Sequence, residues 1–210
     1  MNILILNASP KSKGSASAFY SSLLRLFLTG CEVKVNPLRG ARDYEKIFGL
    51  LPWADAVVIS APVYVDAAPS HVTAFLEQAE QICQEKPCHF KLYAISNCGF
   101  IEGHQNELHL RIYEAWCQRA DVCWGGGVGI GGGVTLVMSL GAVICLVIMG
   151  HRIKHGACHR NLFTRCLMPS FLFIPVSDIF MLLSALAHGN LPYTLFRRCE
   201  CPAREKGTHL

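Results

Sequence analysis

The first seventeen residues constrain the fold most strongly. Residues 1–7 form an apolar run typical of a buried strand, and residues 7–17 form a loop rich in Ser, Lys and Gly. A helical spacing of apolar side chains then begins at Phe19. Backbone N–H groups at the start of a helix have no partner within it and point the same way, so small neighbouring side chains let an anion approach. The segment therefore predicts a phosphate-binding loop, although Ser and Gly would also suit a plain capped turn.

Strand-like and helix-like patterns alternate over the rest of the first 130 residues. This alternation predicts an α/β fold with a five-stranded parallel sheet covered by helices. The run over residues 55–61 is almost wholly apolar, as a central parallel strand should be. Expected strands are residues 2–8, 31–38, 55–61, 90–96 and a fifth from 121, and expected helices are 15–28, 41–51, 69–86 and 104–120.

Ligands of such sheets bind at the carboxyl ends of the strands. Four loops should open there: residues 9–17, 62–70, 97–103 and 125–133. The last of these is a glycine-rich run that suits a tight turn. Glu102 and His104 in the third loop are either a proton relay or simply the start of a helix.

Charge is unevenly distributed along the chain. Residues 1–132 hold 11 Lys/Arg against 12 Asp/Glu, a net charge of −1, whereas residues 133–210 hold 8 against 3, a net charge of +5. We therefore expect a domain over residues 1–133 and an apolar, basic helical extension over 134–210. The 11 cysteines are odd in number and several lie in apolar segments, which favours free thiols and a reducing, cytoplasmic location. Met1 leads directly into a strand, so no cleavable signal peptide is expected.

Three segments, in the right order, resemble the flavodoxin-like NAD(P)H-dependent FMN reductases and quinone reductases. The first is the Asn-x-Ser-Pro-Lys-x-x-x-Ser-x-Ser pattern over residues 7–17. The second is Ala-Pro-Val-Tyr over residues 61–64, followed by Pro-Ser at 69–70 and Phe-Leu at 75–76. The third is the glycine-rich run over residues 124–133. The resemblance implies a flavodoxin-like three-layer sandwich.

The resemblance also implies a role for individual residues in binding FMN. Five would hold the phosphate: Ser9, Lys11, Ser15, Ala16 and Ser17. Four would line the flavin ring: Pro62, Val63, Tyr64 and Val65. Three would contact its polar edge: Asn97, Cys98 and Gly99. The chain departs from the family at Val65 and Asp66, where an aromatic residue and a glycine are usual.

The implied activity is that of an FMN-dependent oxidoreductase. It would pass hydride from NADH or NADPH to a quinone, a flavin or another small acceptor, and flavin N5 would do the chemistry, so no catalytic side chain is expected. One alternative is a flavodoxin-type electron carrier without NAD(P)H activity. Another is a membrane-associated interaction module that has lost its cofactor. The expected partners are a small-molecule electron acceptor and a second copy of the chain, and not nucleic acid.

Other reactive side chains have plainer explanations. Cys98 could be a redox thiol, but a thiol without a lowered pKa is inert. His151, His155 and His159 recur every four residues, which would suit either a metal or a solvated basic helix face. Because HxH and HExxH spacings are absent and Gly156 weakens that helix, no metal site is expected.

Two apolar stretches follow the glycine run, at residues 134–150 and 166–188, with a basic segment between them. A membrane hairpin would place that basic segment outside, against the positive-inside rule, and Asp178 would add a further cost. In the preferred interpretation the first stretch is the fifth helix of the sheet. A helix over residues 177–187 within the second stretch then packs on the first or lies on the inner face of a membrane. The role of Cys199 and Cys201 is left open.

Overall fold

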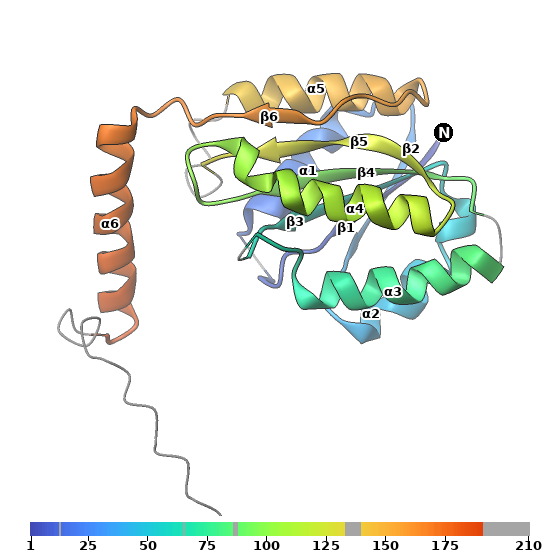
Figure 1. The fold of residues 1–210 in the computed structure, drawn as a ribbon, viewed down its shortest axis with the longest axis horizontal. Helices are drawn as coiled ribbons and strands as arrows, with labels where there is room; N and C mark the ends of the chain where they lie inside the picture. The colour runs from blue at the N-terminus through green and yellow to red at the C-terminus, as the bar shows by residue number, and fades with distance from the viewer. Residues whose placement is uncertain (13, 65, 86–87, 133–139, 191–210) are drawn as a thin grey trace, which may run out of the picture. The chain divides into compact units, whose positions relative to one another are not determined.

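The computed structural model describes the chain except for residues 13, 65, 86–87, 133–139 and 191–210. It divides into two compact units, Met1–Met168 and Pro169–Leu210. The first unit is a parallel sheet with helices on both faces (Figure 1). The predicted boundary at residue 133 thus falls inside this unit, because later segments join the sheet and one of its faces.

The sheet has six strands in the order β2-β1-β3-β4-β5-β6, and all paired neighbours are parallel. The predicted fold class is confirmed, but the sheet has one strand more than expected. The sixth strand spans three residues, which is too short to show a period in the sequence. The strands are β1 (Asn2–Asn7), β2 (Glu32–Pro37), β3 (Ala56–Pro62), β4 (Lys91–Asn97), β5 (Cys123–Ile130) and β6 (Leu162–Thr164).

Each face of the sheet has its own hydrophobic core. One face is covered by α1 (Ala16–Phe27) and α5 (Leu140–Lys154). The other is covered by α2 (Ala41–Phe48), α3 (Ser70–Glu85) and α4 (Glu107–Arg119). Short 3₁₀ turns, η1 (Leu51–Trp53) and η2 (Gly103–Asn106), precede β3 and α4. The three central strands are buried almost throughout, as their continuous apolar sequences predict.

The glycine-rich run is not the loop that the sequence predicted, because most of it forms strand β5. Its glycines leave room for neighbours on both faces of the sheet. A Cβ atom at Gly125 would lie 2.4 Å from the Tyr93 ring, and one at Gly127 would lie 2.6 Å from Leu110. The pairing with β4 shifts register beside Tyr93, where Gly126 has a φ of +117°. Close packing against large side chains therefore explains the glycines here, and the need for a turn does not.

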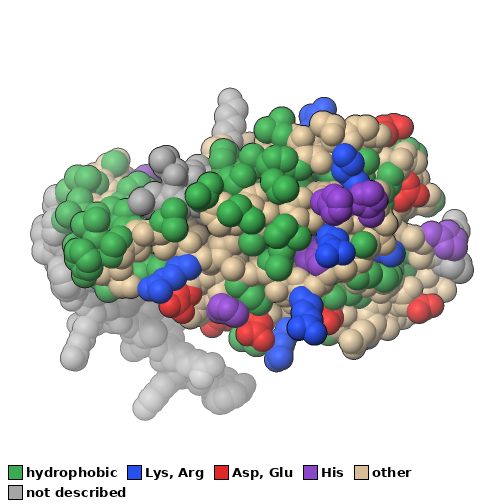
Figure 2. All heavy atoms as spheres, turned by 90° about the horizontal axis from the view of Figure 1, so that it is seen from above, with side chains coloured by type: hydrophobic (Ala, Val, Ile, Leu, Met, Phe, Trp, Pro, Cys, Tyr) green, Lys and Arg blue, Asp and Glu red, His purple; other side chains and the backbone are tan. Residues whose placement is uncertain are grey.

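The first apolar stretch forms α5, as preferred from the sequence, although residues 134–139 lie outside the described part. One side of α5 is buried on the sheet through Ala142, Leu146, Met149 and Ile153. The opposite side exposes Leu140, Ile144, Val147 and Ile148. Figure 2 looks onto this side of the first unit, and hydrophobic side chains lie along it, with His, Lys and Arg gathered beyond them.

The second unit contains α6 (Ser170–Ala187), which begins earlier than the expected residue 177 and continues through Pro175. Most of its large apolar side chains are exposed, with Phe171 at 80% and Met181 at 69%, whereas Phe173 is buried. Within the described residues, α6 is the one helix whose length and mean hydropathy of 1.9 would allow it to cross a membrane. Cys199 and Cys201 lie outside the described residues.

Candidate functional site

The phosphate loop predicted from the sequence leads directly into α1. Ser15 is the N-cap of that helix, and its Oγ accepts a hydrogen bond from the Ala18 N–H at 3.2 Å. The amides of Ala16 and Ser17 belong to the first turn, where the helix itself offers no acceptor. No acidic residue lies in that turn, so the positive end of the helix dipole is not neutralised. This helix start can bind an anion.

The Ser side chains of the loop have different surroundings. Ser9 is buried, and its Oγ accepts a hydrogen bond from the Lys11 N–H at 3.3 Å, while the Lys11 side chain is exposed. Ser17 is also buried, and its hydroxyl donates to Asn97 Oδ1 at 3.0 Å. Among the described residues, the Ser9 and Ser15 hydroxyls have no acceptor for their protons and can donate them to a ligand, whereas the Ser17 proton is already used.

Asn97 joins the loops that follow three different strands. Its side chain accepts the bond from Ser17, and its backbone carbonyl accepts one from the Val63 N–H at 2.9 Å. It also pairs with Pro62 across the ends of β3 and β4. The loops after β1, β3 and β4 are thereby held together at the carboxyl edge of the sheet, as the sequence predicted.

The loop after β3 turns back on itself beside Tyr64. Tyr64 and Ala67 exchange two backbone hydrogen bonds of 3.2 Å, and the Tyr64 ring is 49% exposed. Asp66 within this turn has a φ of +59°, the left-handed conformation that glycine adopts most easily. The turn thus keeps a glycine-like backbone at the position where the family usually has glycine. Val65 lies outside the described residues.

Cys98 is buried and faces the interior of the loop after β4. Its sulfur accepts a hydrogen bond from Asn106 Nδ2 at 3.3 Å, and its N–H donates to the Ile130 carbonyl at 3.0 Å. Burial raises the pKa of the thiol, and hydrogen bonds to Phe100 and Asn106 offset part of that rise. These contacts favour the inert interpretation of Cys98. Among the three residues predicted for the flavin edge, only Gly99 is exposed.

Two residues beside the phosphate loop were missed from the sequence. Arg39, just after β2, donates from Nη2 to the Ser12 carbonyl at 3.3 Å. Its Nε is buried and has no hydrogen-bond partner among the described residues. His71, in the first turn of α3, places Nε2 3.0 Å from the Ala8 carbonyl. Both come from elements far along the chain, and no local motif marks them.

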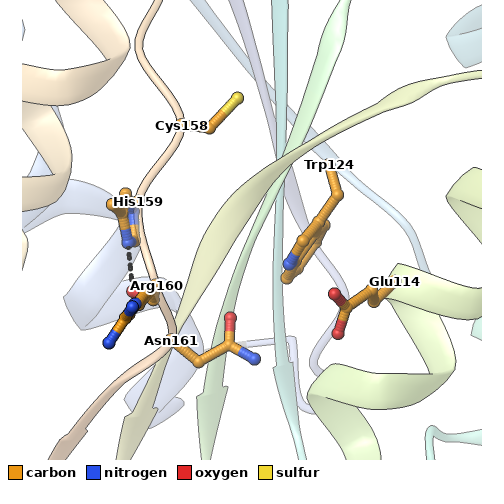
Figure 3. A pocket seen from close by; sticks show the side chains of 6 residues that line it. All are labelled: Glu114, Trp124, Cys158, His159, Arg160 and Asn161. Atoms are coloured by element: carbon orange, nitrogen blue, oxygen red, sulfur yellow. Dashed lines mark hydrogen bonds between the residues drawn. The ribbon is translucent and has the colours of Figure 1, made fainter.

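A cavity of about 290 Å³ lies beside the loop after β4 and is lined by residues in and next to η2 and β6, including Glu102, His104 and Arg165. The His104 ring stacks on Phe163, with centroids 4.2 Å apart. Glu102 precedes η2 and His104 is its second residue, so both lie at a helix start, the position that one of the two alternatives gave them. A larger cavity of about 480 Å³ lies elsewhere, between α4 and the segment before β6 (Figure 3). In the described part of the chain, no three His, Cys, Asp or Glu residues gather as metal ligands would.

The loop over residues 9–17 fits an anionic group such as the FMN phosphate. It combines the uncompensated start of α1 with three donors that have no acceptor among the described residues: the hydroxyl protons of Ser9 and Ser15, and the buried Arg39 Nε near the same loop. An unpartnered buried donor is costly, and a bound phosphate would remove that cost.

Comparison with solved structures identifies the fold as flavodoxin-like. An NAD(P)H:quinone oxidoreductase from Methanothermobacter marburgensis has a TM-score of 0.60 and 14% identity, covering 76% of this chain and 98% of that chain. A flavodoxin from Streptococcus pneumonia has a TM-score of 0.58 and 11% identity, covering 75% and 100%. An FMN-dependent NADH-azoreductase from Bacillus anthracis, solved with FMN, has a TM-score of 0.57 and 12% identity, covering 73% and 99%. No protein-family model and no curated protein matches the sequence. The chain therefore has the fold that the resemblance implied.

Proposed function

We propose that this chain is an FMN-dependent oxidoreductase that takes hydride from NADH or NADPH and reduces a quinone, a flavin or another small acceptor. The observation that carries the proposal is the meeting of three predicted cofactor loops at one sheet edge, joined through Asn97. The similar structures include a quinone oxidoreductase and an azoreductase bound to FMN, which supports the same proposal.

The bound flavin would supply the redox chemistry, and the chain would supply position and charge. Ser9, Ser15 and the first amides of α1 would hold the phosphate, with Arg39 and Lys11 adding positive charge beside it. Pro62, Val63 and Tyr64 would line the ring, and the exposed Gly99 would leave room at its polar edge. Asn97 would fix the distance between the phosphate loop and the ring loops through its bonds to Ser17 and Val63.

The test is a visible spectrum of the full chain, purified in mild detergent, before and after FMN and then NADPH are added without oxygen. We expect flavin absorption bands that bleach when NADPH or NADH is added and return when a quinone follows. A flavin that binds but stays oxidised would support an electron carrier. Failure to bind FMN would overturn the proposal and support the interaction module.

The charge of the first 132 residues favours the enzyme over the electron carrier. Carriers of this fold would benefit from a strongly acidic surface that steers them to basic partners, whereas this segment carries a net charge of only −1. A small neutral or mildly charged acceptor needs no such steering.

We also propose that α6 brings the chain to a membrane surface. The helix exposes its large apolar side chains to solvent, and residues 133–210 carry a net charge of +5 that would favour anionic lipids. Asp178 would be costly at the centre of a bilayer, so the proposal is contact with the inner face and not a crossing. A quinone acceptor would be available in the same place.

A homodimer through the outer side of α5 is the partner proposal that the first unit supports. Leu140 is 63% exposed and Ile144 is 54% exposed, and the two lie one helical turn apart with Val147 and Ile148 beyond them. Light scattering after size exclusion, with Ile144→Glu as the variant, tests it. A monomer in the parent protein would overturn it.

A further inference from the structure

Two cysteines that are far apart in the sequence lie side by side at the start of β5. The sulfur atoms of Cys123 and Cys158 are 3.7 Å apart, and both residues are exposed. Cys123 is the first residue of β5, and Cys158 lies in the segment that connects α5 to β6. Neither belongs to the loops at the carboxyl edge, so the proposed cofactor site does not use them.

The segment around Cys158 is held on the sheet from both sides of the thiol. The Tyr93 hydroxyl donates to the Ala157 carbonyl at 3.1 Å, and Lys91 Nζ donates to the Gly156 carbonyl. On the other side, the His159 N–H donates to the Gly125 carbonyl at 2.8 Å. Asn161 Oδ1 then accepts a bond from the Gly127 N–H at 2.9 Å. These bonds fix the backbone on both sides of Cys158, so the two thiols stay within hydrogen-bond distance of each other without a disulfide between them.

A cavity gives small molecules access to one of the two thiols. Cys158 lines the open cavity of about 480 Å³, together with Glu114, Trp124, His159, Arg160 and Asn161 (Figure 3). Figure 3 shows Cys158 and Arg160 along one wall, with Trp124 and Glu114 opposite them. Arg160 is exposed and places a positive charge where the carboxylates of a peptide-like thiol reagent could bind.

We propose that Cys123 and Cys158 form a redox site. A small-molecule disulfide of the glutathione class oxidises the two thiols to an intramolecular disulfide and is itself reduced. The Cys158 thiolate attacks one sulfur of the reagent, which releases one thiolate and leaves a mixed disulfide on Cys158. Cys123 then attacks the Cys158 sulfur and releases the second thiolate. The two cysteines lose two electrons and two protons, and the reagent becomes two thiols. A reducing dithiol reverses the reaction.

Cys158 attacks first because it lines the cavity, and the surroundings of Cys123 suit the second step. Burial and the neighbouring Cys158 thiol raise the pKa of Cys123, whereas Lys91 lowers it. Once Cys158 is in a mixed disulfide, its thiol no longer contributes to that rise, and Lys91 still favours the Cys123 thiolate. The first step therefore prepares the second.

A second pair of sulfur atoms, on Cys83 and Cys88, is closer still at 2.7 Å, but differs in access. Cys83 is buried near the end of α3, and burial together with Cys88 raises the pKa of its thiol. A thiol that ionises so poorly reacts slowly with disulfides. We therefore assign the oxidation site to the exposed pair.

The test uses the full chain, reduced and then incubated with glutathione disulfide, followed by alkylation, proteolysis and mass spectrometry. We expect a peptide pair linked through Cys123 and Cys158, and an upward shift in Tm that a reducing dithiol reverses. Cys123→Ser should accumulate one glutathione on Cys158, because the resolving thiol is gone. Cys158→Ser should form no such link, and Cys83→Ser is the matched control that should form it at the parent rate.

Three results would overturn the proposal. In the first, glutathione remains on Cys158 of the parent protein without the link to Cys123. In the second, the only disulfide found joins Cys83 to Cys88. In the third, neither exposed thiol of the folded protein reacts under conditions in which the thiols of the unfolded chain do. None of these results depends on FMN binding, so the two proposals succeed or fail separately.

Discussion

Asp66 holds a backbone conformation that most residues avoid. With a φ of +59°, it occupies the left-handed region in the turn beside Tyr64. A β-branched residue there would cost about 1–2 kcal/mol, whereas glycine fits without strain. We expect Asp66→Val to lower the free energy of unfolding by about that amount and Asp66→Gly to change it by less than about 1 kcal/mol. Urea unfolding measures both, and equal losses for the two variants would contradict the conformational explanation.

Ser15 and Ser17 are two residues apart and have different partners. Ser15 caps α1 and keeps its hydroxyl proton, whereas Ser17 donates its proton to Asn97. Ser15→Ala should lower stability by about 1 kcal/mol and weaken FMN binding about tenfold, because one hydrogen bond to a charged group is lost. Ser22→Ala, on the exposed side of the same helix, is the control that should leave FMN binding unchanged. Titration of flavin fluorescence gives the affinities, and an unchanged value for Ser15→Ala would remove that residue from the phosphate site.

The burial of His109 in helix α4 makes the stability of the fold depend on pH in mild acid. The residue is fully buried, and its Nδ1 lies 2.7 Å from Ser96 Oγ. Burial lowers its pKa from the ordinary 6.5 to about 4. Between these two values the unfolded chain binds more protons than the folded one, so stability is full above pH 6.5 and falls as the pH drops towards 4, by about 3 kcal/mol in total. His109→Gln should flatten this slope, while His151→Gln, at an exposed position, should keep it.

Adding a side chain at a glycine of strand β5 should destabilise the fold. A Cβ atom at Gly125 would lie 2.4 Å from the Tyr93 ring, whereas one at Gly49, just after α2, would lie no closer than 3.6 Å to its neighbours. Gly125→Ala should therefore cost about 1–3 kcal/mol through overpacking, and Gly49→Ala should cost nothing. Thermal unfolding of both variants checks this, and a harmless Gly125→Ala would mean that Tyr93 can move aside.

For the whole molecule, we expect the second unit to determine whether the chain binds to membranes. Phe171 and Met181 on α6 are exposed, and replacing both with Glu should abolish sedimentation with anionic lipid vesicles. Leu26→Glu on α1 is the control: it removes an apolar side chain of the first unit that is 68% exposed, close to the 69% of Met181, and should leave sedimentation unchanged. Alkaline carbonate should release the parent chain from membranes, and full retention in the pellet would show that α6 crosses the bilayer.

The sequence predicted those parts of the molecule whose signals are local. The continuous apolar strands, the cap at Ser15 and the meeting of the loops all follow from short patterns and from the geometry of parallel sheets. The glycine run of β5 was taken for a turn because its cause is the size of distant side chains such as Tyr93 and Leu110. Arg39 was missed for the same reason, since only folding brings the end of β2 to the phosphate loop.

The short last strand has a consequence for how the chain is made. β6 pairs with only the last three residues of β5, and it leaves the ribosome after α5 has been synthesised. Until then the outer edge of β5 is open to other nascent chains, which is when edge strands aggregate most readily. Glycine is among the poorest strand formers and adds no apolar side chain to such an encounter. The crowding that keeps side chains away from Gly125, Gly127 and Gly129 thus also gives the growing polypeptide an edge to which a foreign strand binds weakly.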